Sequence, residues 1–495
     1  MQRTTFFSTT NKNSYLYSFK RNYFLFAHPI IRRLYQKEFS TDDEKYYDLT
    51  RDKNDFSEKQ TFSYSDYKYY IRKYRMIKES GCFSEKDGSK IIDGLLSPHD
   101  IEYELCNLRT LVFEVTEKCN LSCDYCFYGD HYSQYEKRKN LDFPLENAIA
   151  MLVFLKEKWT SKQNISREKE IYIGFYGGEP LLNFPFISTI VKHVQNIQQQ
   201  TGLKFRFNMT TNAVLLDKYI DYLVEHNFAL TLSIDGNKFE NGYRVFPNGK
   251  PSYNIVYKNI MLLKSNYPTY YQQSVLLNAV LHDKNNFIEI EKFAKNEFDK
   301  TIRGSEVNPL LVGKDFKYKG HKYDLIKEND ARCFLSSDEP THYNMFLRNF
   351  TNFHFEDYND LYYSNKAPHF LPTGTCNPFS KRMFITAQGK ILPCEVVGHG
   401  FALGEVVDGK VELEINNIAN TYNTYFKRIR IKCNTCHRIN FCTDCLFLNI
   451  IKNGSTLICN MLNSLEHGKL LEDYYTFFET FPKIYYKIWE DARYV

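Results

Sequence analysis

The segment EVTEKCNLSCDYCFYGDHY contains three cysteines that are close enough together to bind metal jointly. Three residues separate Cys119 from Cys123, and two separate Cys123 from Cys126. Thiolates with this spacing on one loop can bind three corners of a [4Fe–4S] cubane and leave the fourth iron without a protein ligand. The alternatives are a zinc site, which would need a fourth ligand, or buried structural cysteines.

Composition and charge narrow the class of protein. Apolar residues make up 43% and charged residues 25% of the 495 residues, which is typical of a globular protein with two or three domains. The net charge of +5 is small and the basic residues form no long block, so we expect no nucleic-acid partner. We find neither a run of about 18 apolar residues nor a signal-peptide core, and therefore expect a cytoplasmic protein without membrane contact. In that reducing compartment, thirteen cysteines favour metal or redox chemistry over disulfides.

The elements that would position the three cysteines alternate regularly along the chain. We expect strands at 110–115, 171–177, 205–211, 229–234, 274–281 and 301–307, and helices near 144–158, 184–199, 217–226, 252–265 and 286–296. This alternation predicts an α/β fold with a parallel sheet or an open barrel. Because ligand sites in such folds lie at the carboxyl ends of the strands, we expect the loops that begin near Thr116, Gly177, Thr211 and Asp235 to surround one mouth.

Residues 110–310 resemble the radical S-adenosylmethionine (SAM) superfamily, since the cysteine motif follows the first strand and a GGEP turn ends the second. The resemblance implies a partial (β/α)6 TIM-like barrel with a [4Fe–4S] cluster on Cys119, Cys123 and Cys126. It also implies that SAM binds the open iron and is reductively cleaved to a 5′-deoxyadenosyl radical, while the protein supplies placement and excludes water. The competing class is an electron carrier or a zinc-stabilised scaffold without SAM chemistry.

The resemblance also assigns SAM-binding residues at the strand ends. Tyr125 lies where the family places a residue against the adenine, and Glu179 of the GGEP turn can accept hydrogen bonds from the SAM ammonium. Ser233 and Arg244 resemble residues that contact the SAM carboxylate and ribose; a strand-end cap and a surface arginine are the alternatives. Asp235 is a candidate catalytic residue on the substrate side. The expected cofactor contacts are Tyr125, Gly177, Gly178, Glu179, Pro180, Ser233 and Arg244.

Seven further cysteines resemble the SPASM extension of radical SAM peptide-modifying enzymes, which implies a cysteine-rich domain with two auxiliary [4Fe–4S] clusters. The sequence departs from the family in one place, because only Thr443 and Asp444 separate the fifth and sixth of these cysteines, where three residues are usual. By position, the distal cluster would be bound by Cys433, Cys436, Cys442 and Cys459, and the proximal cluster by Cys376, Cys394 and Cys445.

Alternatives remain for this cysteine-rich segment. The fourth proximal ligand is either Cys333 or missing, which would leave an iron open to a substrate thiolate. A zinc ribbon is the competing site, and its ligands would be Cys433, Cys436, Cys442 and Cys445. Glu395 lies where sulfatase-maturing relatives carry a catalytic aspartate, so we expect it to accept a proton during substrate oxidation. Cys82 and Cys106 have no partners by spacing, and we expect both to be buried as small apolar side chains.

The chain before the first strand of the series predicts a separate small domain. We expect a β-hairpin within residues 14–28, a helix from Pro29 to about Glu38 and a second helix over 67–79. Two strands followed by helices predict a winged-helix-like α+β unit, and its topology resembles the leader-binding element of peptide maturases. A purely stabilising role is the alternative. The predicted organisation is an N-terminal domain (1–108), a radical SAM barrel (109–310), an insertion (311–370), a SPASM domain (371–460) and a helical tail (461–495).

These features predict an enzyme that generates a radical from SAM and modifies, by cross-linking, a ribosomally synthesised precursor peptide. Its expected partners are that peptide with its leader, which would pair with an exposed strand by β-augmentation, and an electron donor such as flavodoxin or ferredoxin. The alternative is a sulfatase-maturing type of enzyme that oxidises a Cys or Ser of a protein substrate. The sequence does not identify the linkage or the target side chain.

Overall fold

The computed structural model describes residues 4–18, 23–39, 62–84, 95–126, 128, 138–306, 375–433, 445–453 and 456–459, with 472, 475, 476, 479, 480 and 482 near the end. The predicted insertion at 311–370, with Cys333, lies outside the described residues. Cys436 and Cys442 also lie outside them, as does the side chain of Cys459. Across the described residues, no helix combines the length and apolar character that crossing a bilayer requires.

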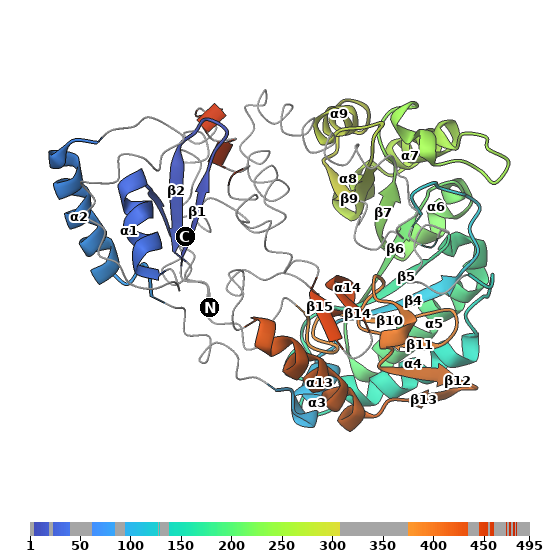
Figure 1. Ribbon diagram of the computed structural model, residues 1–495. Helices are drawn as coiled ribbons and strands as arrows, with labels where there is room; N and C mark the ends of the chain where they lie inside the picture. Colours follow the sequence, from blue (N-terminus) through green and yellow to red (C-terminus); the bar gives the residue numbers. More distant parts are fainter. Residues whose placement is uncertain are drawn as a thin grey trace.

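A ten-stranded mixed sheet is the centre of the fold, with strand order β13-β12-β11-β10-β4-β5-β6-β7-β8-β9 (Figure 1). Strands β4 to β9 run parallel and follow one another in chain order, which confirms the predicted series of six strands. Their bounds are β4 (Thr110–Thr116), β5 (Ile171–Gly177), β6 (Phe205–Thr211), β7 (Ala229–Ser233), β8 (Val275–Leu281) and β9 (Ile302–Glu306).

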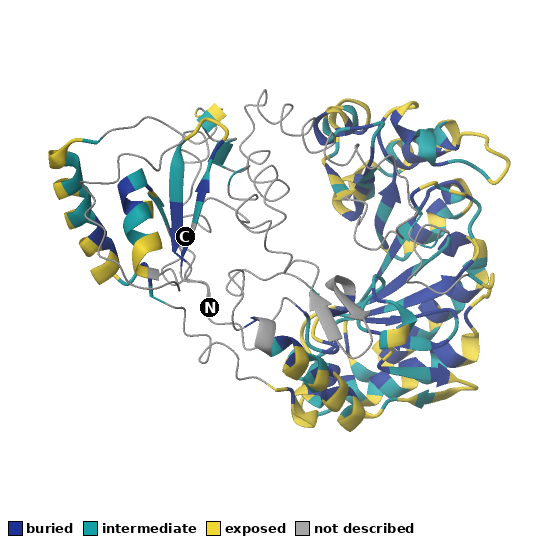
Figure 2. Cartoon of the chain, in the orientation of Figure 1, coloured by how far each residue is buried: buried dark blue, intermediate teal, exposed yellow. Residues whose placement is uncertain are grey.

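Helices connect these parallel strands; five of them were predicted, and the short helix at Pro268–Ser274 was not. They are α4 (Leu145–Trp159), α5 (Phe184–Thr201), α6 (Leu216–Glu225), α7 (Tyr253–Asn266), α8 (Pro268–Ser274) and α9 (Phe287–Phe293). Helix α5 begins with Pro185 in its first turn and ends at Gly202, which adopts the left-handed conformation that closes many helices. Its apolar residues recur at helical spacing and are buried, and the main core is formed where such faces meet the strands (Figure 2).

Four short strands extend the sheet beyond β4, and the sequence analysis did not anticipate them. They are β10 (Met383–Ile385), β11 (Lys390–Leu392), β12 (Gly404–Val407) and β13 (Lys410–Glu412). Strand β10 pairs parallel to β4, and the next three are antiparallel. Strands of three or four residues are too short to show an alternating pattern, so only tertiary pairing reveals them. Part of the predicted cysteine-rich domain therefore belongs to the same sheet as the parallel strands.

A long helix, α13 (Ile415–Cys433), follows these strands and contacts α3 (Pro98–Cys106). Its sequence begins INNIANTYNTYF, and the asparagines and threonines are weak helix formers that conceal its period. The apolar side chains that it buries are Ile418, Ala419, Tyr422, Phe426 and Ile429, one face of a helix. Beyond it lie α14 (Leu446–Asn449) and the hairpin of β14 (Ile450–Asn453) and β15 (Thr456–Cys459).

The N-terminal segment forms a three-stranded antiparallel sheet, β1 (Thr4–Ser8), β2 (Ser14–Ser18) and β3 (Tyr23–Phe26), followed by α1 (Pro29–Phe39) and α2 (Tyr64–Glu79). The β2–β3 hairpin and both helices confirm the predictions, whereas β1 was missed. A capping box in which Ser63 and Asp66 exchange hydrogen bonds begins α2. This segment has its own core, which includes Cys82; Cys106 is also buried, so both cysteines are buried as predicted.

Candidate active site at the carboxyl ends of the parallel strands

The cysteine loop directly follows β4 and is held by its backbone. The Ser122 amide donates to the Val245 carbonyl at 2.7 Å, and the Asp124 amide donates to the Tyr243 carbonyl at 3.3 Å. Within the loop, the Cys126 amide donates to the Cys123 carbonyl at 3.0 Å. These bonds tie the loop after β4 to the segment after β7, so two strand ends fix the position of the three thiols.

The three thiols lie together and are partly buried. Burial raises the pKa of Cys119, and burial together with the other two thiols raises the pKa of Cys123 to about 12. The Leu121 amide donates to the Cys119 sulfur at 3.4 Å. Thiolates in such surroundings need a cationic partner, and bound iron would supply the charge that offsets their burial.

The thiol geometry is also relevant to the kind of metal that could bind. Among the described residues, no three His, Cys, Asp or Glu side chains are close enough to hold a single metal ion. In a cubane each cysteine binds a different iron, so its ligands do not converge on one ion. The chemistry of Cys119, Cys123 and Cys126, three thiols on one loop, fits such a cluster.

The GGEP turn packs directly against the cysteine loop. Gly177 has φ +133°, and a Cβ there would lie 2.3 Å from the Thr116 carbonyl oxygen. A Cβ on Gly178 would lie 2.0 Å from the Lys118 carbonyl oxygen, and the Glu179 amide donates to that same carbonyl at 2.9 Å. In the described structure, the two glycines are therefore required for the close approach of two backbones beside the thiols.

Glu179 links the ends of β5 and β6. Its carboxylate accepts hydrogen bonds from the Thr211 hydroxyl at 2.7 Å and from the backbone amides of Asn212 at 2.8 Å and Leu181 at 3.1 Å. Burial raises the pKa of Glu179 to about 7 even though these bonds favour the ionised form. The carboxylate is near enough to Cys119 to raise the pKa of that thiol. The predicted contact of Glu179 with the SAM ammonium stays a prediction.

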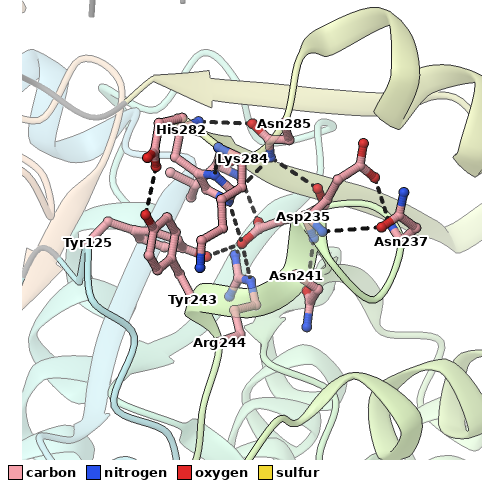
Figure 3. A network of polar contacts seen from close by, with 12 residues as sticks. Tyr125, Asp235, Asn237, Asn241, Tyr243, Arg244, His282, Lys284 and Asn285 are labelled. Carbon is pink, nitrogen blue, oxygen red and sulfur yellow. Dashed lines mark hydrogen bonds and ion pairs between the residues drawn. The ribbon is translucent and has the colours of Figure 1, made fainter. Parts of the chain in front are cut away.

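Asp235 is at the centre of a buried polar network (Figure 3). Both of its carboxylate oxygens accept from the Arg244 guanidinium at 3.0 Å, the Val280 amide donates at 2.8 Å, and the Tyr125 hydroxyl donates as well. Burial would favour the neutral acid, but Arg244 and the hydrogen bonds lower the pKa of Asp235 to about 2. The alternative that Arg244 is a surface arginine is wrong, because its side chain is buried in this pair. Its predicted contact with SAM is untested.

His282 and Asn285 complete this network, and the sequence analysis missed both. His282 is fully buried, lies 3.7 Å from the Asp235 carboxylate, and stacks on the Tyr125 ring with centroids 5.6 Å apart. The Asn285 side chain donates to the Asp235 carbonyl at 3.0 Å. The run HDKNN directly after β8 was the available signal, since polar residues at a strand's carboxyl end face the site in such folds. The network holds Tyr125, which lies within the cysteine loop between Cys123 and Cys126.

A second polar cluster lies near Cys126, between β4, β5 and the strands that follow residue 380. Glu114 is buried within β4 and accepts from the Ala387 amide at 2.8 Å; burial raises its pKa to about 7. Burial is the largest cause of a raised pKa at Tyr176. The charges of Glu395, Cys126 and Glu114 raise this pKa further, so these groups belong to the surroundings of its hydroxyl. Sequence reasoning missed this cluster, although a glutamate inside the apolar strand TLVFEVT was a visible signal.

Glu395 has one oxygen that is bound and one that is not. Its Oε1 accepts from Arg382 at 2.6 Å, while its Oε2 is buried with no hydrogen-bond partner among the described residues. The charge of Glu395 contributes to the raised pKa of Tyr176, as does that of Cys126. A buried acceptor without a donor is unusual in a folded protein and is available to a ligand.

Three of the predicted auxiliary ligands also come together. A hydrogen bond of 2.8 Å from the Leu446 amide to the Thr375 hydroxyl brings the neighbours of Cys376 and Cys445 side by side. Burial raises the pKa of Cys394 to about 12, with contributions from Glu395 and Cys445. The predicted proximal ligands thus share one region, whereas of the predicted distal ligands only the side chain of Cys433 is described, and it is buried at the end of α13.

Comparison with known proteins agrees with this geometry. Residues 113–296 match the Radical SAM superfamily. A radical SAM cyclopropyl synthase of Paramaledivibacter caminithermalis is 31% identical over 226 residues, which are 44% of each chain. A cysteine-type anaerobic sulfatase-maturating enzyme of Clostridium novyi is 24% identical over 346 residues, covering 68% of this chain and 87% of the relative. Of the cyclopropyl synthase, this chain spans less than half the length.

A solved structure of histidine-tagged anSMEcpe with bound AdoMet has the same fold. It covers 77% of this chain and 96% of the other, with 20% sequence identity and a TM-score of 0.50. The fold places the three-cysteine loop at the carboxyl ends of the parallel strands of an α/β domain. The chain accordingly contains a radical SAM domain and is related to anaerobic sulfatase maturases and to a radical SAM cyclopropyl synthase.

Proposed function

We propose that this chain is a radical SAM enzyme that modifies a ribosomally synthesised precursor peptide by introducing a cross-link. The observation that carries the proposal is the group of three thiols on the loop after β4. The two glycines of the GGEP turn let that turn pack closely against this loop. The relationship to a radical SAM cyclopropyl synthase supports radical chemistry that forms a new bond.

The proposed primary site uses Cys119, Cys123 and Cys126 as ligands of a [4Fe–4S] cluster. When bound, that cluster would supply the electron that cleaves SAM to a 5′-deoxyadenosyl radical, after reduction by a flavodoxin or ferredoxin. Glu179 would receive the SAM ammonium, and Tyr125 would lie against the adenine. The Asp235–Arg244 pair would position Tyr125 through the hydrogen bond from its hydroxyl.

The proposed second site belongs to a SPASM domain with two auxiliary clusters, of which the proximal one uses Cys376, Cys394 and Cys445. When bound, these clusters would supply sites for the electron that leaves the substrate. Glu395 would accept the proton that leaves the substrate at the same stage, because its Oε2 has no hydrogen-bond partner among the described residues.

The N-terminal sheet is the proposed binding site for the precursor's leader. Among the described strands, β3 is an edge of the three-stranded sheet, and Phe26 at its end is 55% exposed. An edge strand offers unpaired backbone groups to an extended peptide, and an apolar side chain beside it adds a contact. A labelled leader peptide should bind the full chain in a fluorescence anisotropy titration, and a Leu25→Pro variant should bind it more weakly because proline disrupts the edge.

Maturation of a sulfatase is the second candidate function. It is favoured by the relative from Clostridium novyi, of which the match covers 87%. In that case a Cys or Ser in a short protein segment would be oxidised without a leader. Mass spectrometry of a precursor peptide and of a sulfatase-derived peptide after reaction separates the two functions, since a cross-link joins two residues of one peptide and oxidation changes a single side chain.

The primary assignment is tested with anaerobically reconstituted full-length protein. Replacing Cys119, Cys123 and Cys126 together by Ala should abolish the formation of 5′-deoxyadenosine, whereas Cys106→Ala, a cysteine outside both sites, should retain it. Persistent SAM cleavage in the triple variant would show that these thiols do not bind the catalytic cluster.

A further inference from the structure

Tyr422 has a buried hydroxyl group that no described residue satisfies. It lies in the middle of α13 with its side chain fully buried, and its ring packs against Phe426 and Phe447 with centroids 5.9 Å and 5.1 Å apart. Among the described residues, the hydroxyl has no hydrogen-bond partner. Because an unbonded hydroxyl in a core lowers stability, phenylalanine would be the simpler residue for this packing role.

The surroundings of this hydroxyl are the proposed proximal ligands. Burial raises the pKa of Tyr422, and the thiols of Cys445, Cys376 and Cys394 raise it further, so all three lie close to the hydroxyl. The contact with Phe447 fixes the ring beside the segment that carries Cys445. The hydrogen bond between Leu446 and Thr375 brings the segment that carries Cys376 to the same place.

This donor set fits an iron–sulfur cluster better than a mononuclear site. Three thiols can bind three irons, and a neutral phenol is a hydrogen-bond donor that cluster sulfurs can accept. Phe426 and Phe447 pack against the Tyr422 ring and offer its hydroxyl no hydrogen-bond acceptor. A cluster bound by the three thiols would therefore also explain the unbonded hydroxyl of Tyr422.

We propose that Tyr422 donates its hydroxyl hydrogen to a sulfur of the proximal auxiliary cluster held by Cys376, Cys394 and Cys445. Tyr422 is then a positioning and tuning residue rather than an iron ligand. This inference rests on the proposed function, because it requires that the proximal cluster exists. A hydrogen bond to a cluster sulfur stabilises the reduced state, which carries more negative charge, and so raises the reduction potential.

The test uses the full chain with Cys119→Ala, Cys123→Ala and Cys126→Ala together, so that the auxiliary clusters are the iron–sulfur centres under observation. Adding Tyr422→Phe should leave iron and sulfide content unchanged and move one midpoint potential, followed by electron paramagnetic resonance, to a more negative value. Tyr425→Phe is the matched control, because its ring lies on the same helix and contacts Phe401 and Phe447. It should leave both midpoints unchanged.

A second measurement detects the proton of the hydrogen bond directly in the protein with Tyr422 intact. In the reduced protein with Tyr422 intact, electron–nuclear double resonance should detect a proton that exchanges in deuterium oxide and is coupled to the proximal cluster. Tyr422→Phe should remove this signal.

The outcomes distinguish whether the auxiliary clusters exist from whether Tyr422 donates a hydrogen bond to one of them. Absence of auxiliary clusters in the protein with Tyr422 intact would overturn both the proposed SPASM site and the role of Tyr422. Clusters that are present, with midpoints that Tyr422→Phe does not move, would overturn only the hydrogen bond. Loss of iron with Tyr422→Phe would also overturn it, because that result would make Tyr422 a ligand.

Discussion

Asp235 and Glu395 are carboxylates in different regions of the molecule, and they differ in how fully they are hydrogen-bonded: Asp235 is fully buried, whereas the Glu395 side chain is 27% exposed and has one buried oxygen. Asp235, after β7, has both oxygens bound by donors of its own chain, with Arg244 as the largest partner. Glu395, after β11, has one oxygen paired with Arg382 and the other without a partner among the described residues. A carboxylate whose two oxygens both accept hydrogen bonds anchors its neighbours, whereas one with an unbonded oxygen can still accept a proton.

The largest expected effect is on stability, and it follows from changing Asp235, whose oxygens are both hydrogen-bonded. Asp235→Asn leaves the Arg244 guanidinium buried without its counter-charge, so the free energy of unfolding should fall by about 3–5 kcal/mol. Denaturant titration followed by circular dichroism measures this change. The control is Glu168→Gln, which removes an exposed pair with Lys204 and should cost less than about 1 kcal/mol. Equal effects for the two variants would remove the distinction between anchor and surface pair.

A change at Glu395, which has one unbonded oxygen, should instead affect turnover. Glu395→Gln keeps the size of the side chain but removes the proton acceptor, so peptide modification should fall at least about 100-fold. SAM cleavage without peptide should change little, because the primary thiols are untouched. Product quantification by mass spectrometry measures both rates. If modification and cleavage fall together, Glu395 acts on the primary site and not as a proton acceptor for the substrate.

Gly178→Ala tests how strictly the primary loop is held. The new Cβ would meet the Lys118 carbonyl oxygen at 2.0 Å, so the cysteine loop or the GGEP turn must move. We expect a loss of about 1–3 kcal/mol in stability and less iron bound at the primary site. Gly400→Ala is the control, since nothing lies within 4 Å of its added Cβ. Full iron content in Gly178→Ala would show that the close approach is not required.

The smallest effect concerns pH and Glu114. Burial raises the pKa of Glu114 from 4.5 to about 7, so the folded chain binds this proton more tightly than the unfolded chain. Stability from this group is therefore fully present below about pH 4.5 and is lost as the pH rises toward 7. Relative to Glu114→Gln, the parent should lose about 1 kcal/mol of unfolding free energy between pH 6 and 7. A parallel pH dependence in the two proteins would contradict the raised pKa.

The regular part of the fold was predictable from the sequence because its signals are local. Strand β5 and strand β6 have the predicted bounds, since continuous or alternating apolar runs end at turn residues. Strands β10 to β13 were not predictable, because each is only three or four residues long and depends on pairing with a distant neighbour. Helix α13 was hidden by its asparagines, and only its burial pattern reveals the period.

The candidate site was predictable in its residue types but not in its pairings. The cysteine spacing indicated which thiols share a loop, and the structure brings Cys376, Cys394 and Cys445 into one region. The pairing of Arg244 with Asp235 could not be read from the sequence, because it depends on how the segment after β7 folds back. His282 joins this pair across two strands, and Tyr422 belongs to a helix that the sequence did not suggest.

Strand β10 pairs with β4 through Met383, Phe384 and Ile385, and this contact fixes the distance over which electrons would travel. The strand that leads into the primary thiols, β4, and the strand that precedes Cys394, β11, lie on either side of β10 in one hydrogen-bonded sheet, so two strand spacings of about 4.8 Å each separate them. Any rearrangement that widened the gap between the two cysteine-bearing regions would have to break backbone pairing, so clusters bound at both would keep a fixed separation.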